Sequence, residues 1–318
     1  MRFDEDTSSL PGPVVVVAGP TASGKSAVAD RVALALGTEV ISTDAMQVYR
    51  GMDIGTAKTP VGERLVPLRM IDVVDPVEEY SAALFQRDAR ACIDHLLAQE
   101  KIPVLCGGTG LYIKAAIDAM EFPSGEVGGV RREKYELMLD TLGADGLHAI
   151  LAQRDPESAS VIHPHNTRRV VRALEMLDEG VRYAEQKARF SVPKPYYRSL
   201  QFALTMDRDR LYRRIDARVD AMVEQGLVDE VRELVARGAG EAITSRQAIG
   251  YKEIMDALEG ICSLDEAIEL IKLRSRRYAK RQLSWFRRDP RIVWIDMDEC
   301  SVEQAADIII RAVREGSA

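Results

Sequence analysis

The feature that most constrains this chain is an apolar run that ends in a glycine-rich turn. Residues 14–18 read VVVVA, and the eight residues after them fit the pattern G-x-x-x-x-G-K-[ST]: Gly19, Pro20, Thr21, Ala22, Ser23, Gly24, Lys25 and Ser26. Such a turn wraps a phosphate, so that backbone N–H groups and a helix N-terminus point at the anion. Lys25 would reach the terminal phosphate, and the Ser26 hydroxyl would join a Mg²⁺ shell. The pattern therefore predicts polyphosphate binding but does not specify a nucleoside triphosphate.

Short apolar segments alternate with helical ones along most of the chain. The apolar spacing predicts strands at 14–18, 39–42, 69–74, 102–106, 200–206 and 292–295, and helices at 26–36, 81–99, 208–237, 263–287 and 302–314. Alternation of this kind is typical of a parallel sheet covered on both faces. Residues 131–142, 145–154 and 166–178 are helical in pattern with no strand between them. We therefore predict an α/β core, residues 1–122 and 199–318, interrupted by a helical insertion domain at 123–198.

Two further strand ends carry polar or glycine-rich residues. Asp44 follows the second predicted strand, and Gly107, Gly108, Thr109 and Gly110 follow the fourth. Ligands bind beyond the carboxyl ends of parallel strands, so Asp44 should face the phosphate loop. Its carboxylate could hold Mg²⁺, act as a base, or only cap a helix. The glycine cluster is weak evidence alone, because most such clusters satisfy backbone geometry.

Charge and cysteine usage narrow the class of protein. The 318 residues include 50 acidic and 43 basic ones, for a formal charge of −7, and no apolar run approaches the ~20 residues of a membrane span. Four cysteines at 92, 106, 262 and 300 form no closely spaced pair, which argues against zinc and disulfides and favours a cytoplasmic protein. No membrane partner is expected.

One basic segment stands out against the acidic total. Nine Lys or Arg residues and a single acid, Asp289, lie between positions 272 and 291, with Arg276, Lys280 and Arg287 near one helical face. A local basic face can bind phosphate backbones, because charges are screened beyond about 10 Å. A merely solvated amphipathic helix remains the alternative from the sequence alone.

Taken together, these motifs resemble those of the bacterial tRNA dimethylallyltransferases. The resemblance lies in residues 19–26, the block DAMQVYRGMDIGTAK at 44–58, YSA at 80–82, GGT at 107–109, HP at 163–164, Arg169 with RALE at 172–175, RQAIGY at 246–251, and AKRQ at 279–282 before Trp285. These motifs occur in family order over nearly the whole chain. Two positions depart from the family pattern: Ala45 stands where Ser is usual, and Leu68 where His is common.

This resemblance implies a P-loop NTPase-like parallel-sheet core with a helical insertion. It also implies transfer of a dimethylallyl group from dimethylallyl diphosphate to N6 of the adenine 3′ of the anticodon, with Mg²⁺ as cofactor. Asp44 would be the general base; Lys25, Ser26 and Arg246 would hold the diphosphate; Thr21 and Thr109 would lie beside the reacting groups. A diphosphate leaving group suits a phosphate loop, and an amine that loses a proton on alkylation suits a carboxylate base.

The partner implied is a tRNA anticodon stem-loop bound by a monomer. Because a stacked adenine cannot reach a buried phosphate site, it must be extruded. The residues expected to contact tRNA are Asp44, Ala45, Met46, Gln47, Arg168, Arg169, Val170, Val171, Arg172, Arg246, Gln247, Ala248, Ile249, Gly250, Tyr251, Arg277, Lys280 and Arg281.

Two other functions fit part of the pattern. A small-molecule P-loop kinase would explain the phosphate loop and Asp44, but not the insertion or the basic segment. An RNA-binding protein with a structural nucleotide would explain the basic segment, but leaves Asp44 and Arg246 without a role.

Overall fold

The structure, a computed structural model, describes residues 9–122, 129–239 and 248–316. The chain forms two compact units, Met1–Ala119 with Pro195–Ala318, and Met120–Lys194. Residues 195–198 belong to the larger unit because the Tyr196 N–H donates to the Ile117 carbonyl over 2.8 Å and the Arg198 N–H donates to that of Pro11, also over 2.8 Å.

The larger unit is built on a six-stranded sheet in the order β3-β2-β4-β1-β5-β6, and every pairing in it is parallel. The strands are β1 (Val14–Ala18), β2 (Val40–Ser42), β3 (Leu68–Arg69), β4 (Val104–Gly107), β5 (Ser199–Thr205) and β6 (Ile292–Asp296). This confirms the predicted α/β class with a parallel core.

One predicted strand is largely wrong. The sequence pattern predicts an extended segment at 69–74, yet β3 contains only Leu68–Arg69. The backbone of Met70 (φ 60°) and Asp72 (φ 54°) enters the left-handed region, which ends the ladder. Asp72 instead accepts a hydrogen bond from the buried ammonium of Lys58 over 2.5 Å, so this segment closes the loop that follows β2.

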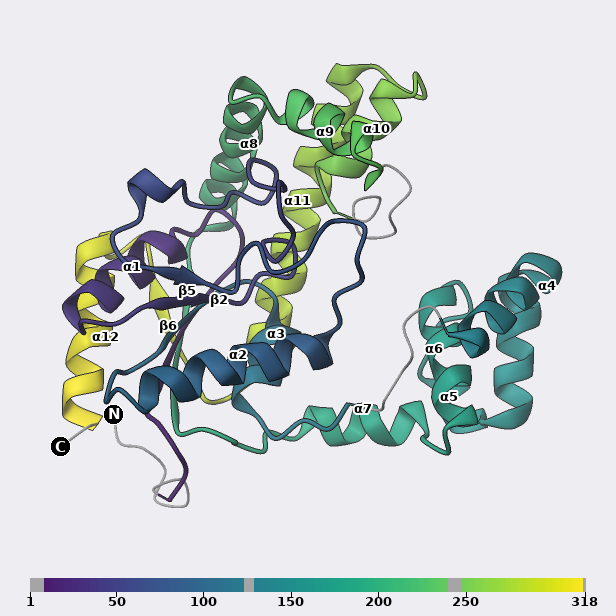
Figure 1. The fold of residues 1–318 in the computed structure, drawn as a ribbon, viewed down its shortest axis with the longest axis horizontal. Helices are drawn as coiled ribbons and strands as arrows, with labels where there is room; N and C mark the ends of the chain where they lie inside the picture. Colours follow the sequence, from purple (N-terminus) through teal and green to yellow (C-terminus); the bar gives the residue numbers. More distant parts are fainter. Residues whose placement is uncertain (1–8, 123–128, 240–247, 317–318) are drawn as a thin grey trace. The chain divides into compact units, whose positions relative to one another are not determined.

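Helices cover both faces of the sheet (Figure 1). Val15 and Val17 of β1 face a layer that includes α1 (Lys25–Ala35) and α12 (Val302–Gly316). The alternate side chains of β1, at Val14, Val16 and Ala18, face α2 (Ala82–Leu97) and α3 (Gly110–Ile117). The uninterrupted apolar sequence of β1 follows from this, since a central strand is buried on both faces.

A second cluster of helices extends beyond the sheet. It contains α8 (Arg208–Glu224), α9 (Leu227–Ala236), α10 (Tyr251–Leu258) and the first half of α11 (Leu264–Phe286), packed with Val48, Tyr49 and Met52 from the loop after β2. The single helix predicted at 208–237 is wrong: it divides at Gly226, whose φ of 102° interrupts α-helical geometry and starts α9.

The smaller unit is entirely helical in its described residues. It contains α4 (Val130–Arg154), α5 (Pro156–Ser160), α6 (Thr167–Asp178) and α7 (Tyr183–Ser191). Gly143 breaks α4 with a φ of 71°, as the two predicted segments 131–142 and 145–154 imply. Tyr135, Leu147, Leu151 and Leu174 form its separate core. Within the described parts of both units, no helix is long and apolar enough to cross a membrane.

Candidate active site

Three chemically distinctive loops leave adjacent strands at one edge of the sheet. The central order β2-β4-β1 pairs Ser42 with Cys106 and Ala18 with Gly107, so these strands end side by side. The phosphate loop, the Asp44 loop and the Gly107–Gly110 turn therefore start next to one another. This convergence comes from parallel strand order alone and brings together residues far apart in the sequence.

The phosphate loop has backbone geometry that only small residues tolerate. Gly24, immediately before α1, has a φ of 95°, and a Cβ on Gly19 would lie 2.8 Å from the Ser23 hydroxyl oxygen. That hydroxyl is buried and has no hydrogen-bond partner in the described structure. Buried polar groups are nearly always paired, so an unpaired hydroxyl inside this loop favours an anionic ligand. The predicted diphosphate-binding loop thus has the cradle that such a ligand needs.

Lys25 lies inside this cradle. Its ammonium donates to the Pro20 carbonyl over 3.2 Å. Burial lowers its pKa from the usual value, and the guanidinium of Arg218 acts in the same direction, while Cys106 and Asp44 oppose the shift. Because burial disfavours the charged ammonium, an anion bound next to it would stabilise that charge.

The Asp44 loop is organised by short-range hydrogen bonds. The Met46 N–H donates to Asp44 Oδ1 over 2.8 Å, and the Ser42 hydroxyl donates to Gln47 Oε1 over the same distance. The Gln47 amide in turn donates to the Thr56 carbonyl over 3.1 Å. Asp44 Oδ2 accepts no hydrogen bond from the described residues, which leaves one carboxylate oxygen for a ligand. Gln47, predicted to contact tRNA, has its amide committed to this loop.

Close contacts explain the glycines that follow β4. A Cβ on Gly107 would lie 2.2 Å from Thr43 Oγ1, one on Gly108 would lie 2.0 Å from Gln282 Nε2, and one on Gly110 would lie 2.1 Å from the Trp285 ring. None of these glycines has a positive φ, so they are required for space and not for backbone freedom. The glycine cluster, which was weak evidence in the sequence, therefore marks the turn against which the Asp44 loop and α11 both pack.

Two arginines of α8 were missed by the sequence analysis. Arg214 Nε donates to the Ala22 carbonyl over 2.8 Å. Arg218, one turn further, forms no ion pair or hydrogen bond with the described residues, and burial lowers its pKa against the pull of Asp44. Their spacing of four residues places both on one helical face, which was the available signal.

Tyr278 of α11 was also missed. Its side chain interacts with those of Thr109 and Gln282, and burial, with Asp44 contributing, raises its pKa to about 12. It therefore lies next to Thr109, whose hydroxyl accepts the N–H of Ala45 in the Asp44 loop.

The predicted motif at 246–251 is only partly described. Arg246 and Gln247 lie outside the described residues. Ile249 is half-buried, whereas Ala248, Gly250 and Tyr251 are buried. Tyr251 is 0% exposed, and its hydroxyl donates to Glu230 Oε1 over 2.6 Å, so its side chain supports the core and does not face a ligand.

The tRNA-binding residues predicted on α6 separate by burial. Arg168 and Arg169 are exposed at its start, whereas Val170 and Val171 are in the core of the smaller unit. Arg172 is half-buried and pairs with Glu175 over 3.4 Å. Of these three arginines, Arg168 and Arg169 present their charge to the solvent and pair with no carboxylate of the described residues.

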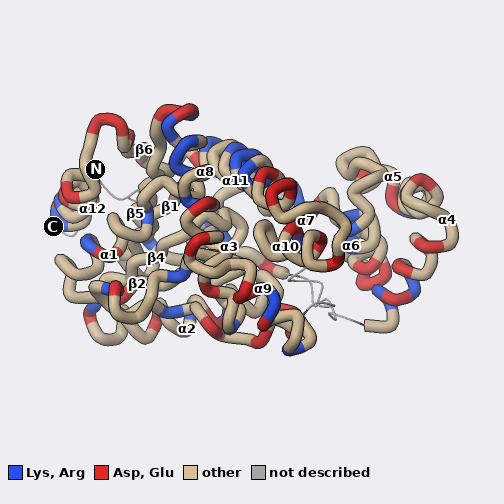
Figure 2. The backbone as a smooth tube through the Cα atoms, turned by 90° about the horizontal axis from the view of Figure 1, so that it is seen from above, with Lys and Arg blue, Asp and Glu red and all other residues tan. Residues whose placement is uncertain are grey.

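The basic segment on α11 divides in the same way. Lys272 pairs with Asp220, Arg274 with Glu253, and Arg276 with Asp216. The expectation that Arg276 shares a free basic stripe is therefore wrong, because its charge is used to hold α11 against α8. A second set of basic residues is exposed and pairs with no carboxylate of the described chain: Arg277, Lys280, Arg281, Arg287 and Arg288. Figure 2 shows how the basic positions gather along α11.

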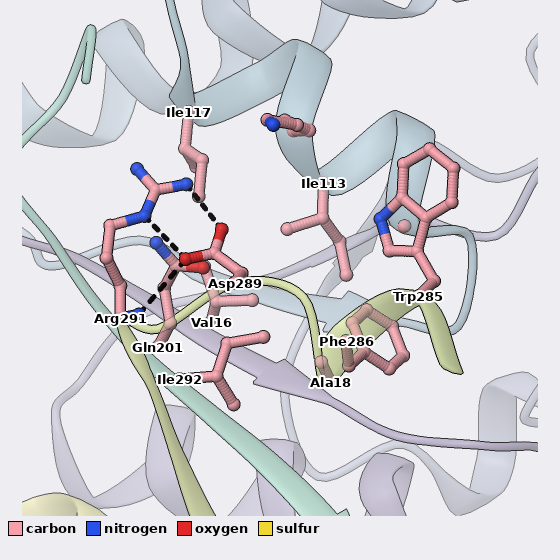
Figure 3. Close-up of a pocket in the computed structure, with 12 residues that line it drawn as sticks. Val16, Ala18, Ile113, Ile117, Gln201, Trp285, Phe286, Asp289, Arg291 and Ile292 are labelled. Atoms are coloured by element: carbon pink, nitrogen blue, oxygen red, sulfur yellow. Dashed lines mark hydrogen bonds and ion pairs between the residues drawn. The ribbon is translucent and has the colours of Figure 1, made fainter. Parts of the chain in front are cut away.

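A small pocket next to α11 belongs to the packing of the sheet and contains none of the side chains predicted for the reaction (Figure 3). Arg291 limits its polar end by pairing with Asp118 over 2.7 Å and with Asp289 over 2.6 Å. Its lining residues are Val16, Ala18, Gly110, Ile113, Lys114, Ile117, Gln201, Trp285, Phe286, Asp289, Arg291 and Ile292.

No group of three His, Cys, Asp or Glu side chains in the described residues could hold a metal ion. The Ser26 hydroxyl, exposed at the start of α1, contacts the Cys106 thiol. A single hydroxyl is compatible with Mg²⁺, because Mg²⁺ takes few protein ligands and keeps waters and phosphate oxygens.

Comparison with known proteins adds independent evidence. The IPP transferase family model matches residues 47–289, and the isopentenyl transferase model matches residues 12–74. The chain is 47% identical over 301 residues to the tRNA dimethylallyltransferase of Carboxydothermus hydrogenoformans, covering 93% of this chain and 96% of that protein. It is 44% identical over 286 residues to the tRNA dimethylallyltransferase of Bacillus subtilis, covering 90% and 91%.

Solved structures agree with this result. The full-length tRNA isopentenylpyrophosphate transferase of Bacillus halodurans superposes with a TM-score of 0.71 at 41% identity, covering 96% of each chain. A eukaryotic dimethylallyltransferase acting on tRNA gives a TM-score of 0.74 at 30% identity, covering 90% of this chain and 74% of that one. The two family models together span residues 12–289, which include the phosphate loop and the smaller unit. This chain belongs to the bacterial tRNA dimethylallyltransferase family.

Proposed function

We propose that this protein transfers a dimethylallyl group from dimethylallyl diphosphate to N6 of the adenine 3′ of the anticodon in tRNA, releasing diphosphate. The observation that carries the proposal is the convergence of a phosphate loop, Asp44 and Thr109 at the ends of β1, β2 and β4. A leaving diphosphate and a nucleophile that loses a proton need this combination of groups within one site.

The phosphate loop binds the diphosphate in this proposal. Lys25 and the unpaired Ser23 hydroxyl lie inside the loop, and Arg218 provides a guanidinium with no internal partner in the described chain. These groups face charge that increases as the C–O bond breaks, so they stabilise the transition state more than the ground state. Arg246, which the family resemblance implies for the same task, remains part of the proposal.

Mg²⁺ would bind next to the diphosphate in the phosphate loop. The Ser26 hydroxyl would hold the ion, with diphosphate oxygens and water completing its shell. When bound, Mg²⁺ would offset the negative charge that develops on the leaving group.

Asp44 acts on the adenine, which accepts the dimethylallyl group. The adenine N6 forms a bond to C1 of the dimethylallyl group, the C–O bond breaks with its electron pair leaving on the diphosphate, and the N6 proton passes to Asp44. Because Oδ1 is held by the Met46 N–H, the carboxylate is oriented and Oδ2 is left for the proton. Thr109 is placed next to this loop by its bond to Ala45.

The tRNA would bind through charge that the fold leaves unpaired. On α11 this means Arg277, Lys280 and Arg281, with Arg287 and Arg288 nearby; on the smaller unit it means Arg168 and Arg169. Contacts to the phosphates supply the affinity that offsets extrusion of the target adenine, a few kcal/mol.

Nucleoside mass spectrometry tests the proposal. Purified protein is incubated with unmodified tRNA, Mg²⁺ and dimethylallyl diphosphate, and in parallel with ATP in place of that donor. A five-carbon gain on one anticodon-loop adenine with the prenyl donor alone is the expected result. Phosphate release from ATP without any gain on tRNA would instead assign the phosphate loop to kinase chemistry.

A further inference from the structure

A buried glutamine of α11 connects two of the three loops of the candidate site. Gln282 is 5% exposed. Its Oε1 accepts the N–H of Thr21 in the phosphate loop over 3.0 Å, and its Nε2 donates to the Gly108 carbonyl over 2.9 Å. Both polar ends of one side chain are therefore used, each on the backbone of a different loop.

The fold makes room for this amide at a specific place. A Cβ on Gly108 would lie 2.0 Å from Gln282 Nε2 and 3.2 Å from the Gly19 carbonyl oxygen. Any other residue at 108 would therefore displace the Gln282 amide from its two hydrogen bonds and crowd the backbone of the phosphate loop at Gly19. Backbone conformation does not explain why residue 108 is glycine, since Gly108 has no positive φ. The close approach of Gln282 does.

The bond to Thr21 affects the phosphate loop directly. Thr21 immediately precedes Ala22, a non-glycine residue with a φ of 62°, a conformation that costs about 1 kcal/mol or more and persists only when its surroundings enforce it. The Ala22 carbonyl is held on its other side by Arg214. Gln282 and Arg214 thus flank the strained part of the loop.

The other end of the bridge leads toward Asp44. Gly108 precedes Thr109, whose hydroxyl accepts the N–H of Ala45, the residue after Asp44. Tyr278, one turn before Gln282 on α11, interacts with both Gln282 and Thr109. A continuous set of contacts therefore runs from the phosphate loop through Gln282 to the Asp44 loop.

We propose that Gln282 is a positioning residue that fixes the phosphate loop, in the shape that binds diphosphate, at a set distance from Thr109 and Asp44. This inference rests on the proposed function, because it assumes a diphosphate in the loop. Gln282 touches no reacting atom; it acts through the Thr21 N–H and the Gly108 carbonyl, to which its amide is hydrogen-bonded.

The test compares Gln282→Met with the wild-type protein. Methionine retains the length and apolar bulk of the side chain but makes neither hydrogen bond, so it separates positioning from packing. Binding of inorganic diphosphate in the presence of Mg²⁺ is measured by calorimetry, and single-turnover transfer is measured with saturating donor. We expect the dissociation constant for diphosphate to rise about tenfold, while tRNA affinity stays within about twofold.

Gln201→Met is the matched control. Gln201 is also buried, at 3% exposure, and donates to the Ser199 hydroxyl within β5, away from the phosphate loop. Gln201→Met should lower the melting temperature about as much as Gln282→Met does, but it should leave the dissociation constant for diphosphate within about twofold of the wild-type value. A similar reduction of diphosphate affinity in both variants would reduce the Gln282 effect to general destabilisation and overturn the proposal.

A second substitution covers the case in which Gln282→Met does not fold. Gln282→Asn shortens the side chain by one methylene, so its amide cannot span both loops, and we expect weaker diphosphate binding in the folded protein. Wild-type diphosphate affinity in either folded variant would overturn the positioning role. A wild-type protein that binds no diphosphate would instead refute the proposed function, which keeps the two failures distinct.

Discussion

The backbone N–H of Ala45 donates a hydrogen bond to the hydroxyl oxygen of Thr109 over 3.1 Å. This bond joins the loops after β2 and β4 at the point where Asp44 is displayed. It uses the main chain of residue 45, so it does not depend on which side chain stands there. The methyl group of Ala45 packs partly buried against the core of the α2–α3 face. The departure from serine at this position therefore leaves the connection between the two loops intact.

Replacing Asp44 by asparagine removes the base and retains an oxygen for the Met46 N–H. We expect tRNA affinity to stay near the wild-type value and the single-turnover rate to fall about 10²–10⁴-fold, the usual contribution of a positioned base. Glu63→Gln, an exposed change in the loop before β3, is the matched control and should leave the rate unchanged. A rate for Asp44→Asn within a few-fold of the wild type would remove Asp44 from this role.

Arg218→Gln tests the guanidinium that the sequence analysis missed. Charge-assisted hydrogen bonds contribute about 1.5–3 kcal/mol, so we expect diphosphate binding to weaken by about one to two orders of magnitude. Arg213→Gln is the control, because Arg213 is an exposed neighbour on α8. Calorimetry with inorganic diphosphate separates the two variants, and equal affinities would show that Arg218 does not meet the ligand.

The unpaired basic residues of α11 should set the salt dependence of tRNA binding. Removing one charge that binds a phosphate reduces the slope of log K against log salt by up to about one, so the triple change of Arg277, Lys280 and Arg281 to glutamine should flatten it by about two to three. The control changes Arg311 and Arg314 of α12, which are exposed elsewhere on the larger unit. Titrations at several salt concentrations that yield one common slope would contradict this interface.

Cys106 should be chemically silent in the folded protein. Burial raises the pKa of its thiol to about 12, opposed by nearby Lys25, so the thiolate fraction at pH 8 is about 10⁻⁴. We expect iodoacetamide at pH 8 to modify the partly exposed Cys92, Cys262 and Cys300 in the native protein and to reach Cys106 only after unfolding. Mass spectrometry of the alkylated peptides measures these rates, and equal labelling in the native state would show that the strand end next to Lys25 is open.

Parts of the fold could be predicted because they depend on local pattern. The apolar run of β1 and the spacing of the phosphate loop identify a buried strand that leads into a helix, and both are present. The shortened β3 and the division at Gly226 could not be predicted in the same way. In the first, left-handed residues interrupt an apolar pattern; in the second, one glycine ends a helix whose periodicity continues on both sides.

The candidate site shows a similar separation. Motif spacing predicted a role for Lys25, and the strand end with the family resemblance predicted one for Asp44. Composition offered no means to distinguish Arg276, which pairs with Asp216, from Arg277, which is exposed. Tyr251 belongs to a recognisable motif and still lies fully buried against Glu230. Whether a side chain meets a ligand or a neighbour depends on partners that are distant in sequence.

By itself, then, the sequence determined the class of fold, the phosphate loop and the family, because these depend on short segments whose chemistry is local. Only the tertiary structure decided which charges remain free and how the loops are held together. Arg214 reaches the phosphate loop from α8, and Gln282 joins Thr21 to Gly108 across 261 and 174 positions of sequence. Such contacts are fixed by strand order and helix packing, which bring residues together irrespective of their separation along the chain.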